Sequence, residues 1–413
     1  MEKYGQYRDK GILSQLNHTT YPLCNSDLSP GSGIAPFFPI APPPTTSLLL
    51  PWQLFLAFIR IPILTFAWLV WLCAIRFLPA GSLLRKANQW CLLGIPGVWW
   101  IDLQVDNVRR GSLSQTPRGR LPYPGTIIAS SYTSPLDVLY LAAIFDPIFT
   151  QSYRNSRLVR PITQETALAN CFSITNPLEL VGAGAATSAA GQKTLPLSDL
   201  VRQNPTRIIV LFPESTTSNG RGILKLSPSL LSAAQDTRVF PVSLRYTPAD
   251  VVTPIPGWLE ALRFIWRLNS GQTHCIRVRI GKATTMTRGL SSSSSSSTTM
   301  NDGSSPASMS PSSQTRSSRT SADRASAGRG SFESNFFDTL QASPAQKVAG
   351  GSGGDESDDE AEGGAVTEAE RRVLDALAED LARLGRVKRV DLGVEEKARF
   401  VEAWRRGGKK GKK

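Results

Sequence analysis

Residues 125–145 read GTIIASSYTSPLDVLYLAAIF, and this stretch decides the fold. Its first six residues form a short apolar run that is typical of a buried strand. Ser134, Pro135 and Asp137 suit the N-cap, first and third positions of a helix and predict a capping box. Apolar residues then continue as far as Phe145 and extend that helix. A buried strand followed directly by a helix is the repeating unit of an α/β domain.

The same alternation continues on both sides of this stretch, over residues 102–284. Apolar runs at residues 207–212 and 239–246 predict two more buried strands, and residues 275–280 alternate like an edge strand. Residues 258–268 predict an amphipathic helix between the last two strands. We therefore expect one α/β domain over residues 102–284.

The chain before this domain is first proline-rich and then apolar. Residues 1–46 have no periodic pattern and predict a flexible head. Residues 54–75 are almost wholly apolar and would be about 33 Å long as a helix. Arg60 and Pro62 interrupt this run, which favours a kinked helix held in one leaflet over a straight span.

Two further features support membrane-embedded or interfacial helices over residues 47–101. Trp99 and Trp100 belong to a second apolar patch, at residues 90–101, and tryptophan favours the headgroup region. Basic residues follow the apolar run, which predicts that the α/β domain faces the cytosol; they are Arg76, Arg85, Lys86, Arg109 and Arg110. Helices buried in a soluble core are the alternative for both apolar segments. An N-glycosylation acceptor at Asn17-His18-Thr19 distinguishes a true span from a one-leaflet anchor.

Low complexity and then two helices follow the domain. Residues 285–365 are rich in serine and glycine and end in an acidic run, so we expect a disordered insertion. Thr367 and Glu370 form a capping-box pattern, and a helical pair is predicted over residues 366–406. Its apolar stripes are expected to dock on the α/β domain; an independent interaction module is the alternative. A basic tail, residues 407–413, completes the chain.

Composition limits the classes of function. The formal net charge of the 413 residues is +13, which calls for an anionic partner such as a nucleic acid, a membrane surface or a phosphorylated substrate. No nucleic-acid-binding module is recognisable and long apolar segments dominate the N-terminal region, so we expect membrane and phospholipid and no nucleic acid. The five cysteines show neither pairing nor metal-ligand spacing, and only two histidines are present. We therefore expect a reducing environment and neither a metal site nor a histidine-based triad. We also expect no bound cofactor.

A second polar loop follows the strand at residues 207–212. Residues 211–222 read LFPESTTSNGRG, so Glu214 emerges where the strand ends. Hydroxyl side chains, a tight turn at Asn219-Gly220 and the planar cation of Arg221 follow it. Such groups at the end of a strand are suited to binding a phosphate. An ordinary polar loop is the alternative.

These loops together resemble the signature loops of the glycerophospholipid acyltransferases, and the lysophosphatidic acid acyltransferases of fungal type in particular. The resemblance rests on Ser134-Pro-Leu-Asp137, on residues 212–221, on Pro241-Val-Ser-Leu-Arg-Tyr246 and on the apolar segment ahead of them. It implies an α/β domain with a mixed sheet flanked by helices. It also implies acyl-CoA as co-substrate and a lysophospholipid as acceptor.

The resemblance also implies roles for individual residues. Asp137 matches the family's catalytic aspartate, whereas Tyr132 stands where the family has its catalytic histidine. Ser215 stands for a common glycine and Thr217 for a common arginine, and Arg221 is our candidate for the missing cation. The residues implied in substrate binding are Phe212, Pro213, Glu214, Ser215, Thr216, Asn219, Arg221 and Pro241.

Tyr132 leaves the proton transfer open. A phenol with its usual pKa near 10 is only about one part in a thousand ionised at pH 7. Three arrangements would provide a proton acceptor. In the first, Arg221 or another cation lowers the pKa of Tyr132; in the second, Asp137 accepts the proton directly; in the third, His274 folds into the site. The remaining alternative is a packed aromatic side chain at the rim of a pocket, without catalysis.

The sequence therefore predicts transfer of a long-chain acyl group from acyl-CoA to lysophosphatidic acid. The expected location is the cytosolic face of the endoplasmic reticulum or the surface of lipid droplets. An inactive relative that binds lysophospholipid or acyl-CoA in lipid-droplet or membrane-trafficking organisation is the alternative. Both hypotheses require Asp137 and the loop that starts at Glu214 to converge on a single cleft beside a lipid surface.

Overall fold

A computed structural model describes residues 7–9, 33–42, 47–106, 108, 118–173, 194–285 and 366–410. Most of the predicted head, with its acceptor at Asn17, lies outside the described residues. So do the predicted insertion after Thr285 and the last three residues of the basic tail.

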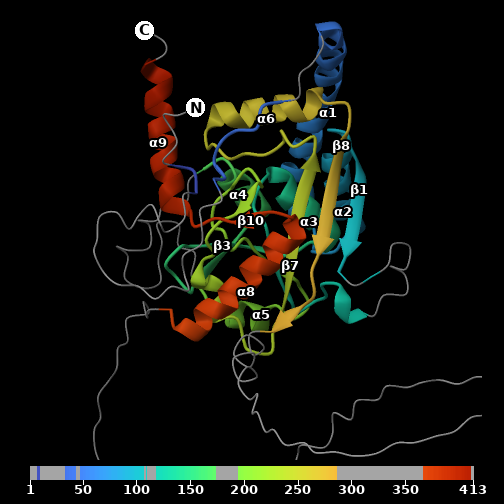
Figure 1. Cartoon of the computed structure of the whole chain (residues 1–413). Helices are drawn as coiled ribbons and strands as arrows, with labels where there is room; N and C mark the ends of the chain where they lie inside the picture. Colours follow the sequence, from blue (N-terminus) through green and yellow to red (C-terminus); the bar gives the residue numbers. More distant parts are fainter. Residues whose placement is uncertain are drawn as a thin grey trace, which may run out of the picture. The chain divides into compact units, whose positions relative to one another are not determined.

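The described part of the chain alternates helices and strands as an α/β domain does (Figure 1). Its helices are η4 (Ser47–Leu49), α1 (Leu50–Cys73), η5 (Ile75–Phe77), α2 (Leu83–Gly94), η7 (Arg118–Arg120), α3 (Pro135–Phe145), α4 (Gln164–Asn170), α5 (Leu197–Gln203), η9 (Pro228–Ser232), α6 (Trp258–Ser270), α8 (Glu368–Gly385) and α9 (Val394–Lys410). Its strands are β1 (Val98–Val105), β2 (Ile127–Ser130), β3 (Ile148–Ser152), β4 (Val159–Ile162), β5 (Ile209–Leu211), β6 (Gly222–Ile223), β7 (Arg238–Thr247), β8 (His274–Ile280), β9 (Thr284–Thr285) and β10 (Lys388–Arg389).

Eight of these strands form one mixed sheet, as the resemblance implied. Their order is β1-β8-β7-β2-β5-β3-β4, and β9 pairs with β7. β2 runs parallel to both β5 and β7, whereas β8 is antiparallel to β7 and β4 to β3. The prediction of an edge strand at residues 275–280 is wrong, because β8 is paired on both sides and β1 lies at the edge. β1 also begins at Val98, within the segment expected to be helical.

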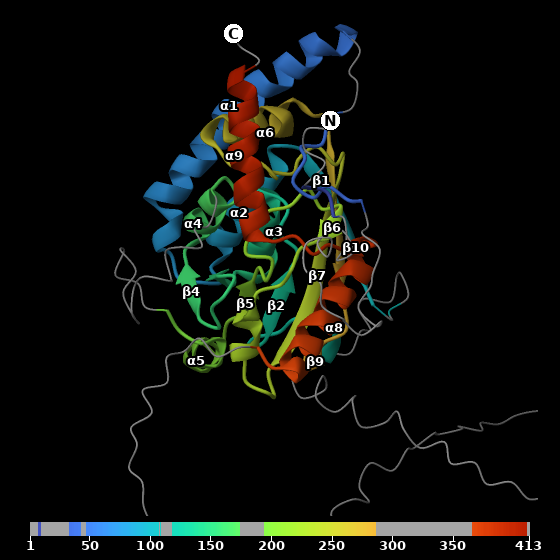
Figure 2. The ribbon, with the colours of Figure 1, turned by 60° about the vertical axis from the view of Figure 1, so that its left-hand side comes forward.

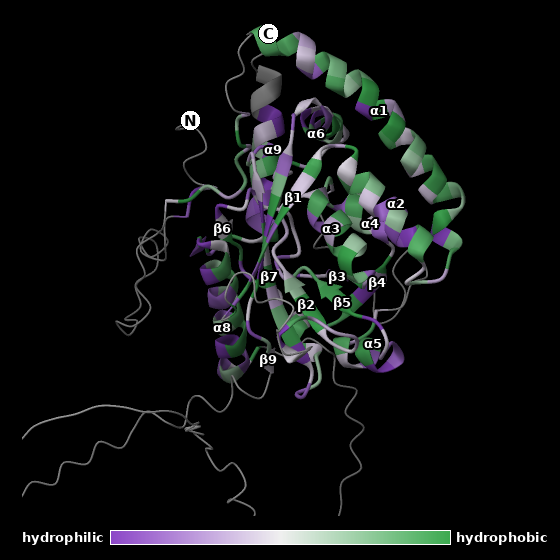
Figure 3. Ribbon diagram, turned by 90° about the vertical axis from the view of Figure 1, so that its right-hand side faces the viewer, coloured by the Kyte–Doolittle hydropathy of each residue, from purple (hydrophilic) through white to green (hydrophobic). Residues whose placement is uncertain are grey.

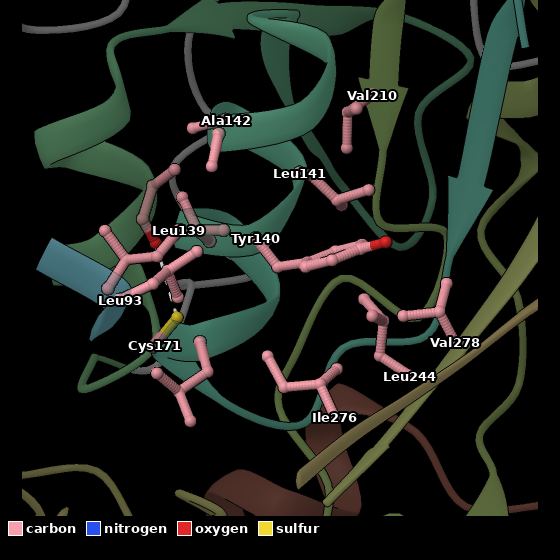
Figure 4. Close-up of a cluster of buried hydrophobic side chains, with 14 of the residues drawn as sticks. Leu93, Leu139, Tyr140, Leu141, Ala142, Cys171, Val210, Leu244, Ile276 and Val278 are labelled. Atoms are coloured by element: carbon pink, nitrogen blue, oxygen red, sulfur yellow. Dashed lines mark hydrogen bonds between the residues drawn. The ribbon is translucent and has the colours of Figure 1, made fainter. Parts of the chain in front are cut away.

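Helices cover both faces of the sheet because its central strands are apolar on both sides. Alternate residues of β2 belong to two different cores. Ile128 belongs to the core that includes residues of α1, α2, α3, α4 and α6, whereas Ile127 and Ala129 belong to the core that includes residues of α5 and α8. Figure 4 shows the first core, where Tyr140 of α3 lies close to Leu244 and Val278. Figure 2 shows α8 lying along β7 on the other face.

The strongest local signals in the sequence are confirmed. α3 spans Pro135–Phe145 and begins with the predicted capping box between Ser134 and Asp137. α8 begins with the predicted box between Thr367 and Glu370. In both cases the side chains at the helix start satisfy backbone N–H groups that have no partner within the helix.

α1 is one continuous helix that passes through Pro62. Leu50–Phe77 is the one stretch of the described residues that is long and apolar enough to cross a membrane. In its most apolar 18 residues, 17% are buried. That fraction argues against a helix buried in a soluble core. The buried residues are spaced along one side of the helix, at Ala57, Leu64, Ala67 and Trp71. Most of its other residues are exposed, including Leu54, Phe58 and Phe66. Figure 3 shows that apolar residues dominate the length of α1.

Arg60, which interrupts the apolar run, binds the end of a second helix. Its guanidinium donates hydrogen bonds to the carbonyl oxygens of Asn269, Gly271 and Gln272, at 3.3, 2.5 and 3.0 Å, and to Pro96. Asn269 lies in the last turn of α6 and Gly271 is its C-cap. A cation at the C-terminus of a helix satisfies carbonyl groups that lack partners and opposes the negative end of the helix dipole. Arg60 therefore ties α1 to α6.

We expect Arg60→Met to lower the free energy of unfolding by about 2–4 kcal/mol, because several charge-assisted hydrogen bonds are lost and α6 keeps unpaired carbonyl groups. Thermal and denaturant unfolding in detergent measure the loss. Arg263→Met on α6 is the control, since its pair with Glu260 is exposed and should contribute no more than about 1 kcal/mol. Equal effects of the two substitutions would contradict this function of Arg60.

Candidate functional site

The two polar loops meet at the carboxyl ends of the central strands of the sheet. β2 lies between β5 and β7 and is parallel to both, so the carboxyl ends of the three strands lie together. The chain leaves β2 through residues 131–134 and leaves β5 through residues 212–221. The backbone N–H of Ser218 donates to the carbonyl oxygen of Tyr132 at 3.0 Å. The loops therefore converge as expected. Asp137 and residues 214–219 are all buried where the loops meet, so these residues do not line the open cleft that both hypotheses required.

Asp137 is fully buried at the start of α3 and accepts four hydrogen bonds. Its Oδ2 accepts from the backbone N–H groups of Thr133 and Ser134, at 2.7 and 2.9 Å, and from Thr133 Oγ1 at 3.1 Å. Its Oδ1 accepts from the phenol of Tyr246. Burial raises the pKa of Asp137 to about 6, although these hydrogen bonds act in the opposite direction. This carboxyl group therefore titrates close to neutral pH.

The phenol of Tyr132 makes its hydrogen bonds away from Asp137. It donates to the carbonyl oxygen of Ala167 at 3.2 Å and accepts from Cys171 Sγ at 3.3 Å. Burial, together with Cys171 and Asp137, raises the pKa of Tyr132 well above its usual value. The expectation that Arg221 or another cation lowers this pKa is wrong, because desolvation favours the neutral phenol.

Glu214 joins the loops through its carboxyl group. Oε1 accepts from the backbone N–H of Tyr132, and Oε2 from that of Leu224, both at 3.3 Å. The side chain is 1% exposed, and burial raises its pKa to about 8. The next residue, Ser215, has a φ of 55°, in the left-handed region that favours glycine. This geometry explains why the resemblance places a glycine there, and Ser152 Oγ lies 2.9 Å from Ser215 Oγ.

The other predicted residues at the start of the loop are packed inside the domain. The ring of Phe212 stacks on that of Tyr132 with centroids 4.3 Å apart. The carbonyl oxygen of Pro213 accepts from the N–H of Ser227 at 2.8 Å. Thr216 Oγ1 is buried and has no hydrogen-bond partner within the described residues. Pro241 lies in β7, opposite Ala129 of β2.

Asn219 and Arg221 lie at the end of the loop, where Asn219 contacts residues 33–42 and Arg221 is exposed. The side-chain amide of Asn219 donates to the carbonyl oxygens of Ala35 and Phe38, at 2.8 and 3.0 Å. It therefore holds residues 33–42 against the loop. Arg221 is exposed where the loop ends at β6, whereas Glu214 and Thr216 are buried.

His274 lies at the junction of α6 and β8. Its Nε2 is 2.8 Å from the carbonyl oxygen of Leu268, and its ring packs against Gly271. Burial lowers its pKa, and Arg60 acts in the same direction. The alternative in which His274 supplies the base is not supported, because its ring is engaged with the end of α6.

Sequence reasoning missed Tyr246 as a member of the site. Its phenol is buried and donates to Asp137, and burial raises its pKa well above the usual value. Alternation along β7 puts Val242, Leu244 and Tyr246 on the face that packs on α3. This alternation, and the place of Tyr246 at the end of the stretch 241–246 that resembles the acyltransferases, could have identified Tyr246 as a member of the site.

Lys397 of α9 is the second missed residue. It is 0% exposed, and its Nζ donates to the carbonyl oxygen of Thr217 at 2.7 Å and to Thr217 Oγ1 at 2.8 Å. A lysine at helical spacing between the apolar residues Val394 and Val401 was the available signal. Its partner could not be found, because the two residues are far apart in the sequence.

No protein-family profile matches the chain. A search of curated proteins finds a Schizosaccharomyces pombe protein named "Putative lysophosphatidic acid:oleoyl-CoA acyltransferase", which is 24% identical over 241 residues. The aligned region covers 57% of this chain and 77% of that protein. This similarity supports an acyltransferase family for the chain.

Proposed function

We propose that the protein transfers a long-chain acyl group from acyl-CoA to lysophosphatidic acid and so makes phosphatidic acid. The observation that carries the proposal is the Asp137–Tyr246 pair, buried at the carboxyl ends of β2 and β7 beside the loop of Glu214. A proton acceptor next to a loop of hydroxyl groups and backbone N–H groups suits an alcohol that carries a phosphate. The name of the similar S. pombe protein agrees with this choice of substrates.

The pair provides a route for the proton without a histidine. The Tyr246 oxygen accepts the proton of the lysophosphatidic acid hydroxyl while the phenol proton moves to Asp137. The hydroxyl oxygen forms a bond to the thioester carbonyl carbon, and the carbon–sulfur bond then breaks. The proton returns through the same pair to the leaving thiolate, which departs as coenzyme A. Thioesters are activated acyl donors, so positioning supplies much of the remaining rate.

The loop at residues 212–221 is proposed to bind the glycerol phosphate. Phe212, Pro213 and Ser215 set the course of its backbone, and Glu214 fixes it to the neighbouring loop. The unpartnered hydroxyl of Thr216 is a hydrogen-bond donor available for the ligand. We propose that Asn219 shapes the end of this site and that Arg221 attracts the anionic headgroup from the exposed side. Pro241 is proposed to contribute to the wall of the acyl pocket.

We propose that α1 lies in one leaflet of the membrane. If α1 crossed a bilayer, Arg60 would hold the end of α6 and residues 271–272 near the middle of the hydrocarbon. Attachment along one leaflet avoids that cost. α6 presents its own apolar side chains next to α1, including Trp258, which is 71% exposed, and Leu262. Attachment to one leaflet is compatible with the endoplasmic reticulum and with lipid droplets, with the domain facing the cytosol.

Purified protein in detergent, assayed with labelled acyl-CoA and lysophosphatidic acid, tests the proposed chemistry. We expect Asp137→Asn to lower kcat by about 100- to 10,000-fold, as loss of a general base does. Tyr246→Phe should also lower kcat strongly, whereas Tyr132→Phe should change it less than about tenfold, since its phenol binds Ala167. No turnover in the wild type, together with saturable lysophospholipid binding, would favour the inactive relative.

The pH profile supplies an independent check on the same pair. Because the acceptor must be ionised, kcat/KM should rise with pH through about 6, the pKa of Asp137. The hydrogen bond from Tyr246 lowers that pKa, so Tyr246→Phe should move the rise to higher pH. An unchanged midpoint in that variant would contradict the coupling of the two residues.

Glycosylation of Asn17-His18-Thr19 tests the arrangement in the membrane. In a one-leaflet arrangement the acceptor stays in the cytosol, so we expect no glycan when the full chain is expressed in cells with an endoplasmic reticulum. Digestion with an endoglycosidase followed by gel electrophoresis reports the modification. A matched chain with a cleavable secretory signal at its N-terminus is the control that the acceptor is competent. A glycan on the chain without that signal would show a true span.

A further inference from the structure

We propose that α9, from beyond the predicted insertion, completes the candidate site, with Lys397 as the positioning residue that holds the loop of Glu214 in its binding geometry. The proposal rests on the proposed function, in which this loop binds the phosphate of the acceptor. Lys397 Nζ donates to both the carbonyl oxygen and the hydroxyl of Thr217. Thr217 is three residues beyond Glu214 and next to Thr216.

Thr217 joins three segments of the chain. Its hydroxyl accepts from Lys397 and donates to the carbonyl oxygen of Thr253 at 2.7 Å. The backbone N–H of Thr253 in turn donates to the carbonyl oxygen of Thr133, in the loop of Asp137. A hydrogen-bonded path therefore runs from Lys397 through the phosphate loop to the loop of the proposed proton acceptor.

β10, which precedes α9, also binds the far end of the same loop. β10 pairs with β6, the strand in which residues 212–221 end, so that Lys388 lies opposite Gly222. The N–H of Val390 donates to the carbonyl oxygen of Ile223 at 2.9 Å. The loop is thus fixed at its middle by Lys397 and at its end by β10.

α9 has its own attachment to the domain, so Lys397 is not required simply to hold the helix. Phe400 is fully buried and packs with Phe37 and Phe38, with ring centroids 6.1 and 5.2 Å away. Arg154 pairs with Glu395 at 3.0 Å. An apolar side chain at position 397 would pack without the desolvation cost of a buried ammonium group. The lysine is therefore explained by its donors to Thr217.

The charge of Lys397 acts on the site as well. Burial lowers its pKa to about 7, and Cys171 and Glu214 act in the opposite direction. Lys397 in turn lowers the pKa of Glu214, whose burial raises it. The carboxyl group that joins the two loops is thus influenced electrostatically by α9, which lies beyond the predicted insertion in the sequence.

The test compares Lys397→Met with Arg399→Met in the full chain. Both substitutions replace one basic side chain of α9 by methionine, but Arg399 is exposed. We expect Lys397→Met to raise KM for lysophosphatidic acid about 10- to 100-fold, the equivalent of losing hydrogen bonds from a charged group. KM for acyl-CoA should change much less, and Arg399→Met should leave both constants unchanged. A fall in thermal stability with both KM values unchanged would overturn the proposal.

Amide hydrogen exchange provides a readout that does not depend on activity. In Lys397→Met, residues 214–224 should exchange faster than in the wild type and in Arg399→Met, while α3 stays protected. If the wild type shows no turnover, the proposed function fails, but this exchange pattern still decides whether Lys397 orders the loop. Unchanged exchange in residues 214–224 would overturn the positioning role whatever the activity.

Thr217→Val and Thr217→Ser are the variants to use if Lys397→Met does not fold. Valine removes the hydroxyl that binds Lys397 and leaves the carbonyl oxygen, so the same effects are expected at smaller size. Serine keeps the hydroxyl and should restore KM and the slow exchange. Equal behaviour of the two variants would show that the hydrogen bond between Thr217 and Lys397 does not position the loop.

Discussion

The candidate site depends on two hydrogen bonds that the buried carboxyl group of Glu214 accepts. It accepts one hydrogen bond from the backbone N–H of Tyr132 and one from that of Leu224, and so joins the loop after β2 to the residue that follows β6. A buried acceptor with two N–H partners is costly to leave unsatisfied, so the two loops are held in one geometry. The parallel pairing of β2 with β5 brings the loops close, and Glu214 fixes their position relative to one another.

Local sequence signals were sufficient to predict the helix and strands around this site. They failed where the position of an element or the partner of a residue depends on a segment far away in the sequence. α3 and its capping box follow from Ser134, Pro135 and Asp137, because helix capping is satisfied within a few residues. The position of β8 between β7 and β1 depends on pairing with a segment that looked helical, and alternation alone cannot reveal it. Lys397 reaches Thr217 from 180 residues away, so no local pattern could identify its partner.

Arg60 illustrates the same difference in physical terms. Within the sequence it is a charge that interrupts an apolar helix and weakens the prediction of a membrane segment. In the structure its charge is directed to the carbonyl groups that end α6, which need donors and lie at the negative end of a helix dipole. The residue that argued against a membrane helix therefore joins α1 to α6, and both helices expose apolar side chains.

Burial raises the pKa of both Tyr132 and Asp137, and this favours Asp137 as the proton acceptor. With its pKa raised above 10, the phenol of Tyr132 is ionised in less than about one molecule in a thousand at pH 7. Asp137, with a pKa of about 6, is ionised in about nine of ten molecules at that pH. Geometry agrees, because the phenol of Tyr132 binds Ala167, whereas that of Tyr246 binds Asp137. Loss of the histidine therefore need not remove general-base chemistry, since burial has moved the titration of the aspartate toward the range that such a base requires.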